Sequence, residues 1–416
     1  MQNSARDQEA ESTVGRRPLE GLLVLDLTQM ASGPYATMLL ADAGANVVKI
    51  ERPGSGDPSR GLPPFRFDGA GNSVGAGILR FGRNKRSLAL NLSSEAGKAV
   101  FLKLVKKADV LWENFVPGTM DRLGLSYSAL SAINPGLVYA TISGFGNGET
   151  PERDRAALDV VAQAESGLME VTGEADGPPA MVGAVVGDLV PALYGVIGTL
   201  LALSQRASTG KGAFIDVAMV DSLFALNERA VLAHLLVGEP LVTRGRLGHA
   251  GPYGRFSAKD GYLVIGASIP SLWQRLAKVI GREDLLEQAP APDAEGVWWR
   301  FWEVMRPAVT EWVAQRTCEA ALELLHKQSV PAARVATVKE AAASAHIEAR
   351  HMILEGSHPV AGSFGVVGSP IKISGVPEPE ARPVPLLGEH SDDVLRELLG
   401  YDEAQLASLR VQGAIA

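Results

Sequence analysis

The sequence predicts an α/β fold, with a doubly wound parallel sheet in a large domain and a smaller α+β domain beside it in the chain. Two observations favour this fold. Short apolar segments alternate with segments of helical period, and 416 residues exceed what one hydrophobic core usually supports. The alternation starts with Leu22–Leu27, Tyr35–Ala41 and Ala45–Ile50, which read as strand, helix and strand. This order is the βαβ unit of a parallel sheet.

The same alternation continues to residue 143. Ser87–Leu92, Val110–Glu113 and Leu137–Ser143 read as strands, while Glu95–Lys107 and Met120–Gly124 read as helices. Ligands of doubly wound sheets bind at the carboxyl ends of the strands. We therefore expect a ligand site in the loops near Thr28, Glu51, Asn114 and Gly144.

Composition divides the chain into four parts: a tail (1–17), the first part of the large domain (18–207), a linker with the small domain (208–330) and a C-terminal segment (331–416). The tail is polar and lacks the apolar core of a secretory signal, so we expect it to be disordered. The small domain is rich in aromatic residues. Val309–Lys327 reads as one helix, and Asp392–Leu409 as a helical tail.

Charge and cysteine content exclude several functions. The net charge of −8 is spread without a basic face, which excludes nucleic acid as the main partner. Cys318 is the only cysteine, so neither an internal disulfide nor a cysteine-rich metal site can form. The seven histidines include no H-x-x-x-H pair, and we expect no bound metal. The first strand–helix turn lacks G-x-G-x-x-G, which argues against a nicotinamide site.

The longest uncharged stretch, Leu189–Gln205, is short for a membrane span and contains Pro191, Gly195 and Gly198. We predict a buried helix there, no membrane partner and a cytoplasmic location.

Asp159 stands directly before an apolar run of helical period. Such an Asp is most often a helix N-cap, but an exposed carboxylate at a helix start can also act as a nucleophile. The segment leaves both interpretations open. Cations such as Arg52, Lys85 and Arg122 lie near predicted strand ends. Singly each reads as a surface charge, but together they suit a ligand with phosphate groups.

Six segments together resemble the class III CoA-transferases, the family of formyl-CoA transferase and carnitine CoA-transferase. The resemblance runs from about Pro18 to Ile415. The segments are PLEGLLVLDLTQMASGP (18–34), GANVVKIERPGSGDPSR (44–60), NKRSLALNL (84–92), ADVLWENFVPGTMDRLGL (108–125), LDVVAQAESGLMEVTG (158–173) and LGEHSDDVLRELLGY (387–401).

The resemblance implies two ring-like chains threaded through each other as an interlocked dimer, either a homodimer or a heteromer with a related chain. It implies that residues 331–416 return to complete a Rossmann-like large domain. Coenzyme A would bind as a substrate, not as a permanent cofactor. By position its contacts would be Gln29, Met30, Ala31, Ser32, Arg52, Lys85, Asn114, Phe115 and Arg122.

The family also implies a catalytic aspartate, which we place at Asp159. The residues expected to border the substrate are Ser143, Gly144, Gly248, His249 and Gly251. Attack of the aspartate on an acyl-CoA would give an aspartyl anhydride and then an aspartyl-CoA thioester, from which an acceptor acid takes CoA. We expect succinyl-CoA as donor and a dicarboxylate as acceptor.

Two alternatives stay open. α-Methylacyl-CoA racemase shares this fold, but it needs two groups that exchange a proton at the α-carbon. Racemases pair the aspartate with a histidine, whereas here Leu158 precedes Asp159 and no histidine occurs before His234. The other alternative is a non-catalytic CoA-binding subunit of a heteromeric transferase. The presence of both Asp159 and Lys85 favours an active chain.

Overall fold

The structure is a computed structural model of the chain. It describes residues 15–416 apart from 175–176, 239–241, 244–245, 248–252 and 290–297. The chain divides into two compact units. The large unit comprises the chain up to residue 166 and residues 183–226 and 345–416, and the small unit comprises residues 167–182 and 227–344.

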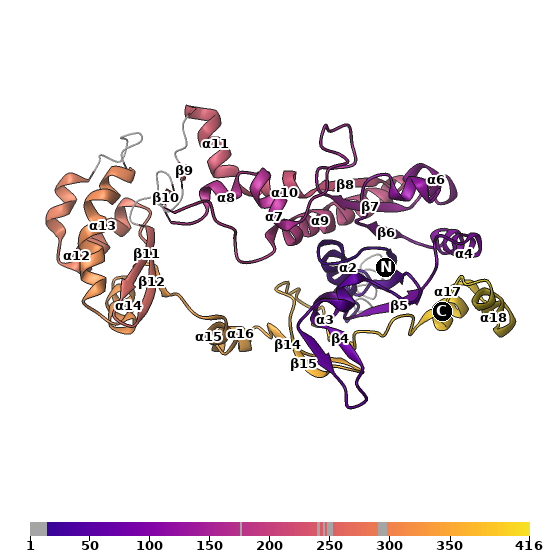
Figure 1. The fold of residues 1–416 in the computed structure, drawn as a ribbon. Helices are drawn as coiled ribbons and strands as arrows, with labels where there is room; N and C mark the ends of the chain where they lie inside the picture. The colour runs from indigo at the N-terminus through magenta and orange to yellow at the C-terminus, as the bar shows by residue number, and fades with distance from the viewer. Residues whose placement is uncertain (1–14, 175–176, 239–241, 244–245, 248–252, 290–297) are drawn as a thin grey trace, which may run out of the picture. The chain divides into compact units, whose positions relative to one another are not determined.

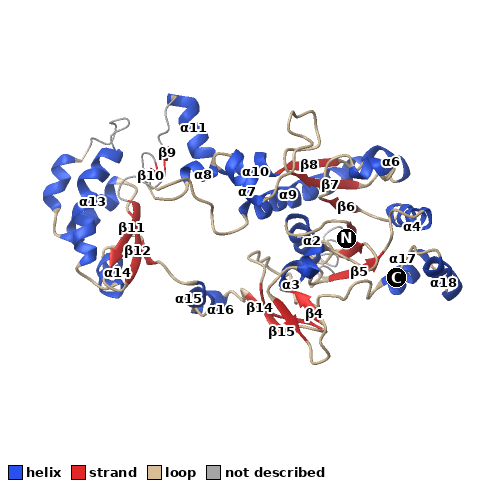
Figure 2. Cartoon of the chain, viewed as in Figure 1, coloured by secondary structure: helices blue, strands red, loops and turns tan. Residues whose placement is uncertain are grey.

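A six-stranded sheet forms the centre of the large unit (Figures 1 and 2). Its strands are β1 (Leu23–Asp26), β2 (Asn46–Glu51), β5 (Lys85–Ala89), β6 (Val110–Glu113), β7 (Val138–Ser143) and β8 (Phe214–Ala218). Their order is β5-β2-β1-β6-β7-β8, and every neighbouring pair is parallel. The predicted parallel sheet is confirmed. The direction of winding reverses between β1 and β6, which is where ligands of such sheets bind.

The strands could be recognised in the sequence because they are buried on both faces. Every residue of β1, β6 and β7 is buried. A parallel strand covered on both faces reads as a continuous apolar run. The helices of the large unit are α2 (Ser32–Asp42), α3 (Ala76–Phe81), α4 (Glu95–Val105), α5 (Thr119–Arg122), α6 (Tyr127–Ile133), α7 (Asp159–Glu165), α9 (Val186–Thr209), α10 (Met219–Leu226), α16 (Ala345–Ala349), α17 (Ser391–Leu399) and α18 (Glu403–Val411). Its remaining elements are η1 (Pro58–Gly61), β3 (Phe65–Phe67), β4 (Ser73–Gly75), β14 (Ile353–His358) and β15 (Gly362–Val367).

The C-terminal segment covers the β5 edge of the sheet. The Ala89 N–H donates to Ser391 Oγ at 3.1 Å, and the Asn91 N–H donates to the Ala414 carbonyl at 2.8 Å. Side chains of α17 and α18 join the same hydrophobic core as Phe101 of α4. Residues from both ends of the chain therefore build one core.

The small unit has its own core around Trp273 and Phe301, whose ring centroids lie 4.7 Å apart. Its three-stranded antiparallel sheet has the order β11-β12-β13. The elements are α8 (Leu168–Val171), α11 (Glu228–Val237), β9 (Val242–Thr243), β10 (Arg246–Leu247), β11 (Tyr253–Ala258), β12 (Gly261–Gly266), α12 (Pro270–Ile280), η2 (Glu283–Gln288), α13 (Trp298–Ala314), α14 (Cys318–Lys327), β13 (Ala332–Arg334) and α15 (Val338–Ala342).

Two predicted helices are wrong in length. Val309–Lys327 is split between α13 and α14, because Thr317 caps the second helix by accepting from the Ala320 N–H. The C-terminal tail is split between α17 and α18 at Gly400, which has φ 71°. The unit boundaries also differ from residues 207 and 330. Strand β8 pairs with β7 and keeps residues 208–226 in the large unit, which takes up the chain again at residue 345.

Helix α9 confirms the helix predicted for the uncharged stretch, but not its complete burial. One side packs closely on the sheet: a Cβ added to Gly195 would lie 2.4 Å from the Trp112 ring. The other side exposes large apolar residues, among them Ile197 and Leu201. Of the helices in the described ranges, α9 alone has the length and composition of a membrane span, and a third of its most apolar window is buried.

Candidate active site

One amide side chain links the loops that follow β1 and β6, the place where doubly wound sheets generally have a ligand crevice. Asn114, directly after β6, accepts from the Gln29 N–H at 2.8 Å and donates to the Gln29 carbonyl at 2.9 Å. These two hydrogen bonds have the donor and acceptor pattern of paired strands, and they fix the turn from Gln29 to Ser32. Four of the predicted CoA contacts therefore lie in one turn, and a fifth, Asn114, is hydrogen-bonded to it.

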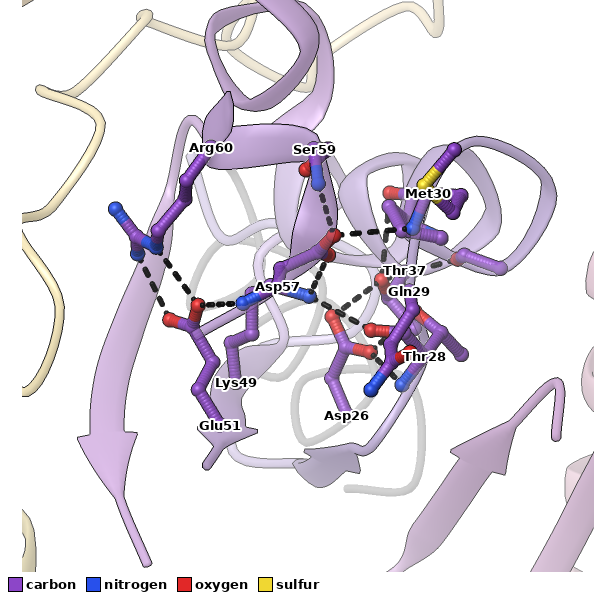
Figure 3. Close-up of polar contacts among 12 residues, drawn as sticks. Asp26, Thr28, Gln29, Met30, Thr37, Lys49, Glu51, Asp57, Ser59 and Arg60 are labelled. Carbon is purple, nitrogen blue, oxygen red and sulfur yellow. Dashed lines mark hydrogen bonds and ion pairs between the residues drawn. The ribbon is translucent and has the colours of Figure 1, made fainter. Parts of the chain in front are cut away.

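A buried ion pair between Lys49 and Asp57 also holds this turn (Figure 3). Lys49 Nζ lies 2.8 Å from Asp57 Oδ2 and donates to the Thr28 carbonyl at 2.8 Å. Asp57 Oδ1 accepts from the Met30 N–H at 3.1 Å and the Ser59 N–H at 2.8 Å. Met30 has φ 67°, a left-handed conformation that a side chain disfavours. These contacts offset that cost and leave the Met30 side chain exposed.

Lys85 does not reach the surface of this site. Its ammonium is fully buried and donates to Asp26 at 3.0 Å, Thr37 at 2.7 Å and the Pro34 carbonyl at 2.9 Å. Burial would raise the pKa of Asp26, but the charges of Lys85 and Lys49 outweigh it and hold that pKa at about 2. Burial lowers the pKa of Lys85 to about 8. Lys85 thus supports helix α2 beneath the turn.

Arg52 lies on the surface at the end of β2. The loop that carries it is held by Glu51, whose carboxylate accepts both Nε and Nη2 of Arg60 at 2.8 Å and the Asp57 N–H at 3.0 Å. Figure 3 shows Arg60, Glu51 and Asp57 as one connected network. Arg52 itself is exposed, and we find no anionic partner for it within the described ranges.

Phe115 and Arg122 lie beyond the crevice, on the loop and helix that follow β6. The Phe115 N–H donates to Glu113 Oε2 at 2.7 Å. Burial raises the pKa of Glu113 to about 7, against the hydrogen bonds that it accepts. Arg122 is exposed on α5, where it donates to Thr119 Oγ1 at 2.8 Å. Its guanidinium forms no ion pair with a described residue.

Asp159 begins helix α7, but its carboxylate is fully engaged. Gln163 Nε2 donates to both of its oxygens at 3.0 Å, and the Gly187 N–H donates to Oδ1 at 2.7 Å. A Cβ on Gly187 would lie 2.8 Å from Asp159, so the close approach of α7 and α9 requires a glycine. The side chain thus joins two helix N-termini and is not a simple N-cap.

Asp188, in the first turn of α9, was missed by the sequence analysis. It is half-buried, and its carboxylate accepts no hydrogen bond from any described residue. Burial raises its pKa to about 6, with the negative charge of Asp159 as the second cause. In the sequence Asp188 directly precedes the uncharged stretch, but an acidic residue in the first turn of a helix is also favoured by the helix dipole, so the pattern does not single it out.

The other substrate-bordering residues are placed in part. Ser143 ends β7 and accepts from the Gly146 N–H at 3.0 Å. A Cβ on Gly144 would lie 2.4 Å from Ala157 Cβ, so the loop after β7 meets the start of α7. Gly248, His249 and Gly251 lie outside the described residues. Within the described ranges no group of three or more His, Cys, Asp or Glu side chains has the arrangement of a metal site.

Comparisons with known proteins agree on one family. The family model of CoA-transferase family III matches residues 19–391. The chain is 42% identical over 386 residues to a succinyl-CoA:mesaconate CoA-transferase of Haloarcula marismortui, covering 91% of this chain and 96% of the relative. It is 34% identical to a succinyl-CoA:glutarate CoA-transferase of Mus musculus, covering 96% and 90%. A CAIB/BAIF family protein from Brucella suis superposes with a TM-score of 0.77 at 31% identity, covering 92% of this chain and 100% of that one.

Proposed function

Because the chain belongs to CoA-transferase family III and moves CoA between an acyl-CoA and a carboxylate, we propose that succinyl-CoA is its donor and a second dicarboxylic acid its acceptor. The observation that carries this assignment is the likeness over nearly the whole chain to transferases named for succinyl-CoA with mesaconate or glutarate. A buried cysteine and the absence of any disulfide suit a reducing compartment, and we place the enzyme in the cytoplasm.

We propose that the nucleotide end of CoA lies across the crevice between β1 and β6. The turn from Gln29 to Ser32 offers a preformed surface there, because the two hydrogen bonds of Asn114 fix the backbone conformation of the turn. Arg52, directly after β2, and Arg122, on the helix after β6, are exposed guanidinium groups, and such groups pair well with phosphate oxygens. Lys85 acts indirectly, by fixing the helix behind the turn.

The carboxylate pair Asp159 and Asp188 supplies the nucleophile. The sequence favours Asp159, but the geometry favours Asp188. Asp159 already accepts three hydrogen bonds, which stabilise its charge and reduce its reactivity. Asp188 accepts none from the described residues, and its raised pKa makes it more basic than an ordinary aspartate, as suits a nucleophile. We therefore assign attack to Asp188 and the positioning of its helix to Asp159.

The reaction proceeds by exchange of acyl bonds. The Asp188 carboxylate attacks the thioester carbonyl, and the C–S bond breaks to give a succinyl–aspartyl anhydride and CoA thiolate. The thiolate attacks the aspartyl carbonyl, releasing succinate and leaving an aspartyl-CoA thioester. The acceptor carboxylate then repeats both steps in reverse, taking CoA and restoring Asp188. Each step forms one acyl bond and breaks another, so the cycle needs no external energy source.

A panel of acids tests the function. The purified single chain, incubated with succinyl-CoA and mesaconate, glutarate, malate, oxalate or butyrate, is expected to form new CoA esters with dicarboxylates, detected by mass spectrometry. Turnover by one chain type also separates an active enzyme from a non-catalytic subunit. Deuterium uptake from solvent at the α-carbon without any new ester would instead identify a racemase, and no reaction at all would contradict the proposed donor.

We further propose that the enzyme is a homodimer, interlocked as in its family, and that a second copy covers α9. Leu193, Tyr194, Ile197, Leu200 and Leu201 recur along one exposed face of this helix. Large exposed apolar faces generally mark interaction sites, because left uncovered they cause aggregation, and a second copy of the chain would cover this one.

Changing Ile197 and Leu201 together to Glu is expected to prevent assembly, because it places two charges in the apolar face. Light scattering would then report the 43.9 kDa chain where the unaltered protein has twice that mass. Val338→Glu is the matched control, since Val338 is 88% exposed and belongs to a different helix, α15, in the small unit. An unaltered protein that is monomeric would contradict the proposal.

A further inference from the structure

The large unit contains a cavity of about 550 Å³ next to the carboxylate pair. It is formed by residues of α2, of β3 and α3, and of the hairpin of β14 and β15, which are elements of the large unit in Figure 1. Its volume is within the range of small-molecule sites. Leu189, the residue after Asp188, contributes to its wall, so the cavity reaches the start of α9.

The wall of this cavity consists mostly of apolar side chains, and its charged side chains are all positive. Phe65, Leu79 and Phe364 contribute apolar surface, while three arginines and no acidic residue line it. Such a lining suits a ligand that has both a hydrocarbon part and an anionic group. A purely apolar ligand would leave the arginines unused.

One of the three arginines is already neutralised. Arg83 Nη2 lies 2.7 Å from Asp42 Oδ2, with both side chains buried. Arg80 and Arg66 are exposed to the cavity and solvent, and neither forms an ion pair in the part of the chain that the structure describes. The Arg80 guanidinium lies 4.6 Å from the centroid of the Phe81 ring, a cation–π contact that limits its movement.

Arg80 is also the cation that acts on Asp188. Burial and the charge of Asp159 raise the pKa of Asp188, and the positive charge of Arg80 opposes them. A dicarboxylic acyl group would bring a third negative charge next to Asp159 and Asp188. Without a cation at this place, that charge would be repelled.

We propose that Arg80 binds the free carboxylate of a dicarboxylic acyl group whose thioester carbonyl faces Asp188, and that it thereby selects dicarboxylic over monocarboxylic acids. The apolar wall receives the carbon chain between the two ends. This inference rests on the proposed function, since it names the residue that recognises the acids transferred there.

Arg80→Gln keeps the length and polarity of the side chain and removes its charge. With succinyl-CoA as donor, kcat/KM for a dicarboxylate acceptor is expected to fall about 30-fold or more, the usual cost of removing one partner of a desolvated charge pair. At about pH 8, where Asp188 is ionised with or without the Arg80 charge, kcat/KM with acetyl-CoA as donor and butyrate as acceptor is expected to change less than about threefold, because neither acid has a second carboxylate. Arg80→Lys is expected to recover part of the dicarboxylate activity.

Lys106→Gln, which removes an exposed cation that does not line the cavity, should leave both reactions unchanged. Equal losses with both pairs of acids, or no loss with either, overturn the role of Arg80. A general loss of fold would show as a lower urea midpoint in Arg80→Gln than in Lys106→Gln. Failure of the unaltered enzyme to transfer CoA would overturn the proposed function itself, which is a different result.

Discussion

Asp188→Asn is expected to reduce CoA transfer by roughly 10⁴-fold or more, as removal of a covalent nucleophile does. An amide cannot form the anhydride, whereas its shape still fits the first turn of α9. Binding of CoA should persist, because the turn from Gln29 to Ser32 does not contact Asp188 through any described hydrogen bond. Steady-state kinetics, with calorimetry for CoA binding, provide the measurement.

Asp159→Asn is the matched comparison, and pH separates the two residues. Transfer needs ionised Asp188, so kcat/KM should rise with pH through about 6 and fall as the pH drops below it. The negative charge of Asp159 is one cause of the raised pKa of Asp188. Its removal should therefore lower that pKa and move the acid limb of the profile to lower pH, with activity reduced but not lost.

Trapping decides which carboxyl group is acylated. Hydroxylamine added during turnover converts an acylated aspartate to a hydroxamate, which mass spectrometry locates in the sequence. We expect the label at Asp188. A label at Asp159, together with high activity in Asp188→Asn, would return the nucleophile to the residue that the sequence favoured.

Lys49→Met is expected to destabilise the large unit by about 3–5 kcal/mol, because it leaves the buried carboxylate of Asp57 without its ion-pair partner. Lys49 is 1% exposed, and Asp57 and Asp26 both depend on its charge. Urea denaturation followed by circular dichroism measures the loss. The same substitution should raise the KM for acyl-CoA, because Asp57 would no longer hold the Met30 N–H.

Lys106→Met tests whether any lysine would give this result. Lys106 is exposed at the end of α4, and its substitution should change the free energy of unfolding by no more than about 0.5 kcal/mol. A loss of less than about 1 kcal/mol in Lys49→Met would mean that the buried network does not hold the turn.

The sheet was predictable from sequence because its strands are covered on both faces. Val110–Glu113 was predicted with the same bounds as β6. All four residues are buried, so both faces of the strand are covered. Helix ends were less predictable. Thr317 begins α14 and Gly400 ends α17, each inside a stretch whose apolar periodicity is continuous, so a single cap residue sets a helix end that the period does not show.

The proximity of the candidate site residues was predictable, but their contacts were less so. Strand ends predicted that Gln29 and Asn114 lie close together, and they are hydrogen-bonded, because topology alone brings β1 and β6 together. Lys85 reads as a phosphate contact in the sequence, yet the fold turns its ammonium toward Asp26. Asp188 was hidden because its meaning depends on Asp159, 29 positions earlier along the chain and brought near by Gly187. The distance between side chains on two different helices cannot be read from the residue pattern of the sequence.

The closure of the β5 edge by residues 391–415 has a consequence for protein synthesis. A chain leaving the ribosome exposes the backbone N–H groups of Ala89 and Asn91, and one side of Phe101, until its last helices have emerged. The small unit, complete at residue 344, can fold before then. Nascent chains should therefore carry an open strand edge through most of translation, the kind of surface that chaperones shield and that aggregates when it is left uncovered.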